Sequence, residues 1–355
     1  MKRTGYLYDK IYEWENLLRA YKQAKKGKQS EQITQFEYDW ETGLLHIQDD
    51  LKNHAYKFGH YHVFKIFDPK ERDITCAPFR DRVTHHAICN VIAPYLEKPM
   101  IVDSYASRKG KGMHKALKRG FYFYQNSSYH YRLDIKKFYY TIDHEILVQK
   151  LERKFKDKSL IALLTELISG YQSSSASYFP FAGDDLFDMI RPRGIPIGNL
   201  TSQLFANYYL TSFDHFVREY LSLPFYVRYM DDMIVFAESN QVLKEARQRI
   251  LGYFKDLRLH VNERKDIIQA NKHGIDFLGF RFKNGQIRIR NVNLIRFRRK
   301  LLVKSKQSTQ LTEILRSVNG HLGFLKGGHT KRIINDTFRK INFHNEDKTW
   351  QFILP

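Results

Sequence analysis

Two adjacent aspartates, Asp231 and Asp232, stand between two short apolar runs of the sequence, residues 225–229 and 233–237. Each run has the length and composition of a β-strand, so we expect the pair at the tip of a β-hairpin. Neighbouring carboxylates repel each other, and the arrangement becomes useful where a divalent cation lies between them and a third carboxylate. Because side chains alternate along a strand, we expect Asp231 to face the metal and Asp232 to lie beside it. A solvated turn is the alternative interpretation.

Asp134 is the natural third carboxylate, because it lies near the end of a short predicted strand at residues 129–135. Mg²⁺ is usually held by one or two carboxylates together with waters and substrate phosphates. Two such ions about 4 Å apart could activate a 3′-hydroxyl and stabilise a leaving pyrophosphate. The sequence therefore predicts that Asp134, Asp231 and Asp232 hold the metal ions. Ile135, the residue after Asp134, is also included among the predicted metal-binding residues. Mg²⁺ is the expected cofactor, with Mn²⁺ as a substitute.

The chain of 355 residues is strongly basic, with 59 Lys and Arg against 38 Asp and Glu and a net charge of +21. A globular chain with this charge typically binds a polyanion, and nucleic acid is the first candidate, although a soluble protein rich in lysine is the alternative.

An aromatic content of 15% excludes a disordered chain. The only cysteines, Cys76 and Cys89, exclude a disulfide framework and a cysteine-based zinc site. No apolar run is long enough to span a membrane, so we expect a cytoplasmic protein.

The elements that must position the carboxylates follow an order of helix, β-hairpin, helix, a mixed centre and a basic helical tail from residue 286. At about 150 residues per domain, a chain of this length is expected to form two or three lobes. Apolar spacing predicts helices at residues 10–26, 81–97, 144–169, 201–220 and 240–257. Alternation and turn signals predict strands at residues 60–67, 72–75, 129–135 and 275–282. Residues 171–193 have the composition of an exposed loop, and Asp143 is expected to cap the helix that begins at residue 144.

With these motifs the chain resembles a reverse transcriptase. The segment 229–232 is similar to the family's second catalytic motif, and the segment 133–143 is similar to the first motif in its group II intron-like form. Four further blocks are similar to blocks of the family: residues 81–82, 104–108, 257–265 and 277–280. The resemblance covers about residues 60–285, in the order of the family.

The resemblance implies an α+β fold of the right-hand polymerase type. It implies fingers with an N-terminal helical extension at residues 1–125, a ferredoxin-like palm with the catalytic carboxylates at 126–285, and a basic helical thumb with a C-terminal tail at 286–355. The implied activity is RNA-directed DNA polymerisation with two Mg²⁺ ions, on dNTPs, template RNA and an RNA–DNA hybrid. A non-catalytic RNA-binding scaffold of the same fold is an alternative, against which the intact set of three aspartates argues.

Several residues are expected to bind the nucleotide. The resemblance implies that Tyr139 lies beneath the sugar and excludes a 2′-hydroxyl, and a core aromatic is the alternative. Positive charge stabilises a phosphoryl centre, and the candidates are Lys70, Arg72 and Arg108, with Arg72 ranked first. Lys265 could protonate the leaving pyrophosphate as a general acid. Each of these cations could instead be solvated.

The sequence of residues 194–203 indicates a particular subfamily of this lineage. Most members of the lineage have Pro-Gln-Gly here, whereas Ile197 stands in place of the glutamine, before Gly198 and Gln203. The pattern resembles the reverse transcriptases of diversity-generating retroelements, which implies errors at template adenines during mutagenic retrohoming. Ile197 cannot make the hydrogen bonds of a glutamine amide, a loss on the order of 1 kcal/mol. The alternatives are an Ile197 that only packs the loop, and a group II intron-like or defence-associated enzyme of ordinary fidelity.

The basic tail is the candidate nucleic-acid surface. Lysines and arginines on a helix would follow a duplex backbone, and the expected contacts are Arg296, Arg298, Arg299, Lys300 and Lys304. The resemblance also implies a small, basic, oligomeric accessory protein and an intracellular enzyme encoded by a bacterium or a phage. No membrane partner is expected.

Overall fold

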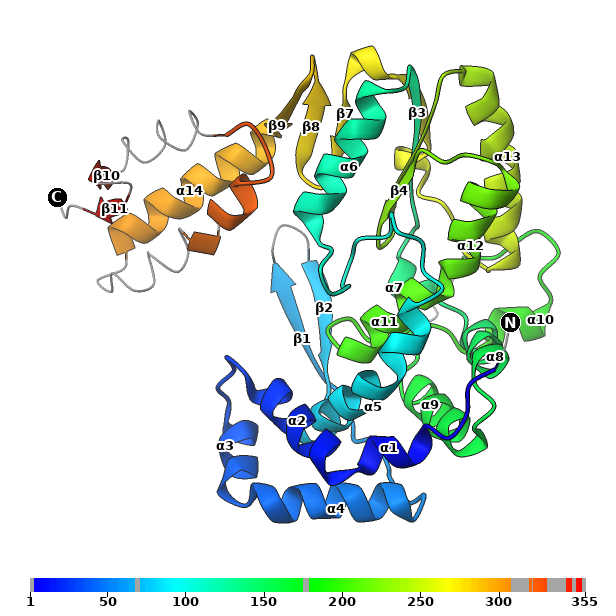
Figure 1. Cartoon of the computed structure of the whole chain (residues 1–355), viewed down its shortest axis with the longest axis vertical. Coiled ribbons are helices and arrows are strands. Elements are labelled where there is room, and N and C mark those ends of the chain that lie inside the picture. Colours follow the sequence, from blue (N-terminus) through cyan, green and yellow to red (C-terminus); the bar gives the residue numbers. More distant parts are fainter. Residues whose placement is uncertain are drawn as a thin grey trace. The chain divides into compact units, whose positions relative to one another are not determined.

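The computed structural model describes residues 3–67, 71–174, 179–307, 319–320, 322–330, 343–346 and 349–352 (Figure 1). The chain divides into two compact units. Unit 1 comprises Met1–Val102, Asp134–Ser222 and Gln248–Glu263, and unit 2 comprises Asp103–Leu133, Leu223–Arg247 and Arg264–Pro355. Both units contain helices and strands, which confirms the predicted α+β class. No helix within the described ranges is both long and apolar enough to cross a membrane.

The N-terminal part of unit 1 is helical and packs around α5. Its helices are α1 (Tyr8–Tyr12), α2 (Trp14–Lys25), α3 (Glu31–Tyr38), α4 (Trp40–Lys52) and α5 (Phe79–Glu97). The single helix predicted over residues 10–26 is wrong, because the chain breaks at Glu13. Asn16 explains the break. Its buried amide donates to the carbonyls of Lys10 and Ile11, and also to the carbonyl of Ala87 on α5.

The hairpin predicted after residue 60 is confirmed. Strands β1 (His62–Phe67) and β2 (Glu71–Cys76) pair antiparallel, with His62 opposite Cys76 and Ile66 opposite Arg72. The strands belong to unit 1.

The helix predicted over residues 144–169 is instead two helices, α8 (His144–Lys154) and α9 (Lys158–Ser169). The N-terminal segment of the chain occupies the interruption. The backbone N–H of Thr4 donates to the Lys154 carbonyl at 2.9 Å, and the N–H of Lys156 donates to the Thr4 carbonyl at 2.8 Å. The interruption therefore depends on a partner far away in the sequence.

Asp157 links this interruption to the first helix of the chain. Its carboxylate caps α9 by accepting the N–H of Leu160 at 3.2 Å. It also accepts the N–H groups of Leu7 and Tyr8, both at 2.9 Å. Burial alone would raise the pKa of Asp157, but these N–H donors lower it below its ordinary value.

The rest of unit 1 also departs from the prediction. The segment predicted as an exposed loop contains α10 (Leu186–Ile190). The helix predicted over residues 201–220 is divided into α11 (Leu200–Tyr209), α12 (Thr211–His215) and the π-helical η2 (Phe216–Tyr220). The Thr211 hydroxyl donates to the Asn207 carbonyl at 3.2 Å, a bond of the kind that bends helices.

Unit 2 is built on a four-stranded sheet in the order β4-β5-β3-β6. The strands are β3 (Tyr129–Asp134), β4 (Tyr226–Tyr229), β5 (Asp232–Ala237) and β6 (Ile267–Ala270). Counted from β6, they stand fourth, first, third and second in chain order, which is the order of a ferredoxin-like sheet. Helix α6 (Met113–Gln125) packs against β4, and α13 (Asn240–Asp256) lies between β5 and β6 in the sequence. The predicted ferredoxin-like sheet is confirmed.

The alternating residues 275–282 form a hairpin and not the predicted single strand. Strands β7 (Ile275–Phe277) and β8 (Phe280–Lys283) pair antiparallel around Leu278 and Gly279. Both turn residues have positive φ, 47° and 84°, as a type I′ turn requires. Strand β9 (Gln286–Ile289) pairs with β8, so the helical tail predicted from residue 286 begins with a strand. Helix α14 (Asn291–Gln307) follows, and β10 (Phe343–Glu346) pairs with β11 (Thr349–Phe352).

Candidate active site

The predicted carboxylate hairpin is present in unit 2. Strands β4 and β5 pair antiparallel, and their last pair is Tyr229 with Asp232. Met230 and Asp231 therefore form a two-residue turn, and Met230 has a φ of 58°. Positive φ is unfavourable for a side chain of this size, so the turn is strained unless its surroundings hold it.

A buried arginine helps to hold this turn. Arg228 on β4 has no exposed surface, and its Nη1 donates to the Met230 carbonyl at 3.2 Å. Its main chain is fixed as well, because its N–H donates to the Asp103 carbonyl and its carbonyl accepts the N–H of Tyr105, both at 3.0 Å. The sequence analysis missed Arg228, since an arginine inside an apolar strand has no local signal of burial.

Asp232 lies beside strand β3. The Nε and Nη2 atoms of Arg132, two residues before the end of β3, each lie 3.4 Å from its Oδ1. Asp231 and Asp232 are both partly buried. The predicted placement of the acid pair at a hairpin tip is thus confirmed, with Asp231 in the turn and Asp232 at the start of β5.

Asp134, the last residue of β3, belongs to unit 1. It is 7% exposed, and its carbonyl accepts the N–H of Asn262 at 2.8 Å. The Asn262 amide also donates to Oδ2 of Asp134 at 3.3 Å. Ile135, which completes the predicted metal set, is buried and bridges to Val261. In the part of the chain that the structure describes, no group of three or more His, Cys, Asp or Glu side chains forms a metal-binding cluster.

Several of the predicted nucleotide-binding residues meet within unit 1. The N–H of Thr75 on β2 donates to the Ile197 carbonyl at 3.0 Å. Gly198 has a φ of 120°, and a Cβ there would lie 3.3 Å from the side chain of Ile74. The positive φ favours glycine at this position, and a side chain there would also press against Ile74. Ile197 and Gly198 therefore lie against the strand that carries Arg72.

Tyr139 is joined to the same segment. Its carbonyl accepts the N–H of Ile195 at 2.8 Å, and the N–H of Gly194 donates to the Ile142 carbonyl at 2.7 Å. The Tyr139 ring is partly exposed. Gln203 lies further along, on α11, and is also partly exposed.

The other predicted site residues do not belong to this group. Arg108 is in unit 2, where its Nη1 donates to the Ser104 carbonyl at 2.9 Å. Lys265, also in unit 2, ends the 3-10 turn Glu263–Lys265. Lys70 lies outside the described residues, and Arg72 is described only by its backbone. Their roles stay predictions.

Helix α14 carries the predicted nucleic-acid contacts. Its exposed positions include both basic side chains and the apolar side chains of Val292 and Ile295, while Phe297 is buried. The predicted contacts on this helix are Arg296, Arg298, Arg299, Lys300 and Lys304, and of these Arg296, Arg299 and Lys300 are exposed. The side chain of Lys304 lies outside the description.

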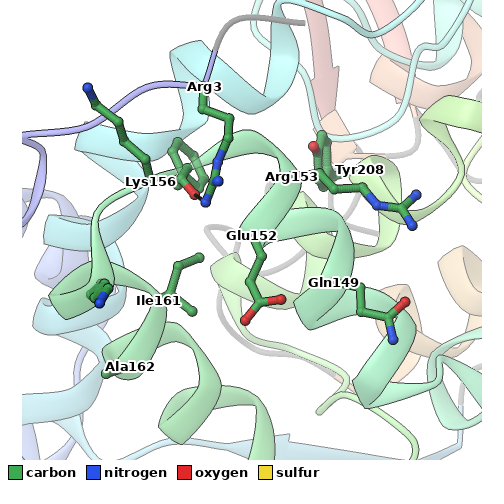
Figure 2. Close-up of a pocket in the computed structure, with 10 residues that line it drawn as sticks. Arg3, Gln149, Glu152, Arg153, Lys156, Ile161, Ala162 and Tyr208 are labelled. Carbon is green, nitrogen blue, oxygen red and sulfur yellow. Dashed lines mark hydrogen bonds between the residues drawn. The ribbon is translucent and has the colours of Figure 1, made fainter.

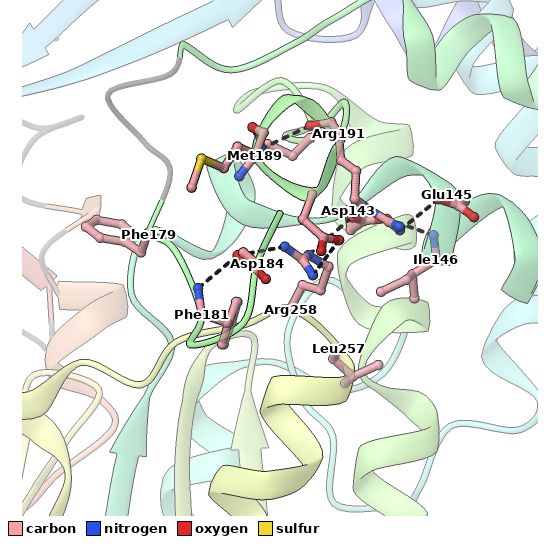
Figure 3. Close-up of polar contacts among 12 residues, drawn as sticks. Asp143, Glu145, Ile146, Phe179, Phe181, Asp184, Met189, Arg191, Leu257 and Arg258 are labelled. Atoms are coloured by element: carbon pink, nitrogen blue, oxygen red, sulfur yellow. Dashed lines mark hydrogen bonds and ion pairs between the residues drawn. The ribbon is translucent and has the colours of Figure 1, made fainter. Parts of the chain in front are cut away.

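A network at Asp143 fixes the segment before Gly194 (Figure 3). As predicted, Asp143 caps α8, because it accepts the N–H of Ile146 at 3.0 Å. It also makes a bidentate pair with Arg191, at 2.8 and 2.9 Å, and this carboxylate raises the pKa of Arg191 above its ordinary value. Arg258 lies 4.0 Å from Asp143 and pairs with Asp184 at 3.0 Å.

Known proteins share this sequence in part. Residues 67–282, more than half of the chain, match the family described as reverse transcriptase (RNA-dependent DNA polymerase). The chain is 24% identical over 184 residues to the COX1/OXI3 intron 1 protein of Saccharomyces cerevisiae, covering 51% of this chain and 21% of that protein. It is 25% identical over 147 residues to an uncharacterized 91 kDa protein in the cob intron of Schizosaccharomyces pombe, covering 41% and 17%. The chain therefore spans about a fifth of the length of these two relatives.

Two further similarities concern a bacterial protein and a solved structure. Protein YkfC of Escherichia coli is 22% identical over 275 residues, covering 63% of this chain and 68% of that protein. Telomerase from Candida albicans, in a complex with the TWJ fragment of telomeric RNA, aligns with a TM-score of 0.50 at 12% identity, over 81% of this chain and 56% of that one. The telomerase similarity concerns the fold alone. It agrees with the right-hand polymerase type, and the family match confirms the resemblance seen in the motifs: the chain belongs to the reverse transcriptase family.

Proposed function

We propose that the chain is an RNA-directed DNA polymerase that adds deoxynucleotides to a primer opposite an RNA template. The observation that carries the proposal is the turn Met230–Asp231, held by buried Arg228 and followed by Asp232. Two neighbouring acids at a strained turn cost stability, and a catalytic role is the physical reason to keep them there. The turn lies inside the segment that matches the family.

Reverse transcriptases generally use divalent metal ions. Mg²⁺ prefers oxygen ligands. Asp231 and Asp232 offer such ligands in unit 2, and Asp134 and the main-chain carbonyl of Ile135 offer them in unit 1. Two Mg²⁺ ions, with Mn²⁺ as a substitute, would neutralise charge on the reacting hydroxyl and phosphates. Asn262 and Arg132 orient the carboxylates of Asp134 and Asp232, respectively.

Other residues act on the substrate. Tyr139 limits the space beneath the sugar and so selects dNTPs, and Lys265 donates a proton to the leaving pyrophosphate. Lys70, Arg72 and Arg108 neutralise the triphosphate. The basic residues of α14 hold the RNA–DNA hybrid through its phosphates.

Primer extension tests the polymerase. Asp231→Asn keeps the size of the side chain and removes its charge, so we expect extension of a DNA primer on an RNA template to fall about a thousandfold. Asp256→Asn is the matched control, because Asp256 is exposed at the end of α13. Extension by the Asp231→Asn variant at the control rate would contradict the proposal. RNA binding without extension by the unmodified chain would favour a non-catalytic scaffold.

We further propose that the enzyme belongs to a diversity-generating retroelement and makes errors at template adenines. Ile197 supports this proposal, because its main chain is fixed to β2 and its apolar, partly exposed side chain stands where the lineage has glutamine. Gly198 and Gln203 would contact the same nucleotide. The small, basic, oligomeric accessory protein is part of this proposal.

Substitution of Ile197 tests the mutagenic role. Ile197→Gln restores an amide that can hydrogen-bond the nucleotide, so we expect misincorporation opposite adenine to fall several-fold. Ile197→Leu remains apolar and should keep the error pattern. Sequencing of the cDNA measures both. Equal error rates at adenine in the two variants would remove Ile197 from the mechanism.

An intron-type enzyme of ordinary fidelity is the second candidate. It is favoured by the two fungal relatives, whose names place them in introns. Faithful copying of adenine by the unmodified chain, with and without candidate accessory proteins, would decide for this candidate.

A further inference from the structure

A large cavity in unit 1 lies where α8 and α9 meet the N-terminal segment, and it is not lined by any of the predicted site residues (Figure 2). Its volume is about 1020 Å³. The lining side chains come from the N-terminal segment, α8, the link between α8 and α9, α9 itself and α11. The proposed polymerase chemistry does not use any of them.

The lining of the cavity is strongly positive. Four cations line it, namely Arg3, Arg153, Lys156 and Lys158, and all four are exposed. The single carboxylate of the lining is Glu152. Within the described part of the chain none of the four cations is paired with a carboxylate. In Figure 2, Arg3 and Lys156 lie on one side of the cavity and Arg153 on the other.

The position of Arg3 is fixed. Its Nη2 donates to the Phe155 carbonyl at 3.2 Å, and its neighbour Thr4 is bonded on both sides of the interruption between α8 and α9. The N-terminal segment thus brings a guanidinium to cations that come from a distant part of the sequence. Such an arrangement is organised before any ligand arrives.

Two further lysines, Lys150 and Lys154, belong to the same helix α8 as Arg153. Burial and the charge of Arg153 lower the pKa of Lys150 to about 8. Burial and the charge of Lys98 lower the pKa of Lys154. Tyr208, which lines the cavity, donates its hydroxyl to the Lys150 carbonyl at 3.2 Å. An anion in the cavity would relieve this accumulation of like charge.

We propose that this cavity binds the phosphodiester backbone of a single-stranded RNA segment outside the polymerase site. A volume of about 1020 Å³ lies at the upper end of the range of small-molecule pockets. The four exposed cations are spread around it, as successive phosphates of a strand require. The inference rests on the proposed function, because a polymerase that copies RNA must hold its template.

Charge removal tests the cavity. The variant combines Arg153→Gln, Lys156→Gln and Lys158→Gln, all at exposed positions, so folding should be unaffected. We expect its affinity for polyuridylate to fall about tenfold and the salt dependence of binding to decrease by a slope of about 2. Extension of a short hairpin primer–template should remain at the level of the unmodified chain.

The matched control combines Lys22→Gln, Lys26→Gln and Lys52→Gln, which remove three exposed lysines of unit 1 that do not line the cavity. Equal polyuridylate affinity in the two triple variants would overturn the inference. A loss of affinity for polyglutamate but not for polyuridylate would overturn it too, and would assign the cavity to an acidic protein. Binding and extension are read separately. Absence of extension by the unmodified chain therefore counts against the polymerase, whereas unchanged RNA affinity counts against the cavity.

Discussion

Arg228 is a fully buried cation, and its guanidinium bonds the main chain of the strained turn of Met230 and Asp231. A buried cation is costly unless its donors are satisfied. Here the guanidinium donates to the carbonyl of the residue whose φ is unfavourable. The arginine therefore positions Asp231 through the main chain, without belonging to the reacting groups.

Replacement of Arg228 should affect stability and extension together. Arg228→Met removes the donor to the Met230 carbonyl, so we expect the free energy of unfolding to fall by about 1–3 kcal/mol. Urea unfolding measures this loss. Arg228→Lys retains a charge and should lose less. An unchanged unfolding midpoint in Arg228→Met would show that the turn does not depend on this bond.

Only some residues of the site could be predicted from the sequence. Asp143 could be predicted as a helix cap, because its acceptor and the N–H of Ile146 are three residues apart. Its pair with Arg191, 48 residues along the chain, has no local pattern. The role of Arg228 could not be predicted for the same reason. The acids at residues 231 and 232, in contrast, are recognisable from the residues next to them in the sequence.

At the scale of elements, local signals predicted the hairpins and long-range contacts decided the breaks in the helices. Turn residues and alternation lie within a few positions of each other, so β1–β2 and β4–β5 were predicted. The gap between α8 and α9 is filled by Thr4, and the bend at Glu13 depends on Asn16 and α5. Periodicity along a segment carries no information about such partners.

Asp157 should be a major contributor to the junction of α1 and α9. Asp157→Ala removes the cap of α9 and the acceptor for the N–H groups of Leu7 and Tyr8. We expect a loss of about 2 kcal/mol or more in the free energy of unfolding at pH 7. Denaturant unfolding measures it. Asp157→Asn keeps an acceptor and should lose less.

The contribution of Asp157 depends on pH with a definite sign. Its pKa is lowered in the folded chain from 3.8, so the folded state binds its proton less readily than the unfolded state. The contribution is complete above the unfolded value and is lost as pH falls through the folded one. The difference between the unmodified chain and Asp157→Ala should therefore shrink below pH 3.8. A constant difference down to the acid transition would contradict this assignment.

The whole molecule carries a net charge of +21, which makes its affinity for nucleic acid sensitive to salt. On α14, Arg296, Arg299 and Lys300 are exposed. Substitution of all three by Gln should reduce the slope of log affinity against log salt by about 2–3 for an RNA–DNA hybrid, since each phosphate contact contributes about 0.9. Fluorescence anisotropy between about 50 and 200 mM salt measures the slope. A slope equal to that of the unmodified chain would remove α14 from the hybrid interface.

The family and the ferredoxin-like sheet could be predicted from the order of the motifs along the chain. Each motif is a short stretch of sequence, and the motifs follow one another in the order that the family has. The division into two units was not predictable in the same way. Each unit is assembled from three separate stretches of the chain. The lobes with boundaries at residues 125 and 285 stay a prediction.

The network at Asp143 has a consequence for proteolysis. A protease must draw its target into an extended conformation, and Arg191 can be drawn out only when its bidentate pair with Asp143 breaks. Helix α10 exposes four apolar side chains beside it: Leu186, Phe187, Met189 and Ile190. We expect this segment to resist cleavage as long as Arg191 pairs with Asp143 and Arg258 pairs with Asp184. Cleavage at Arg191 would therefore report the opening of the N-terminus of α8.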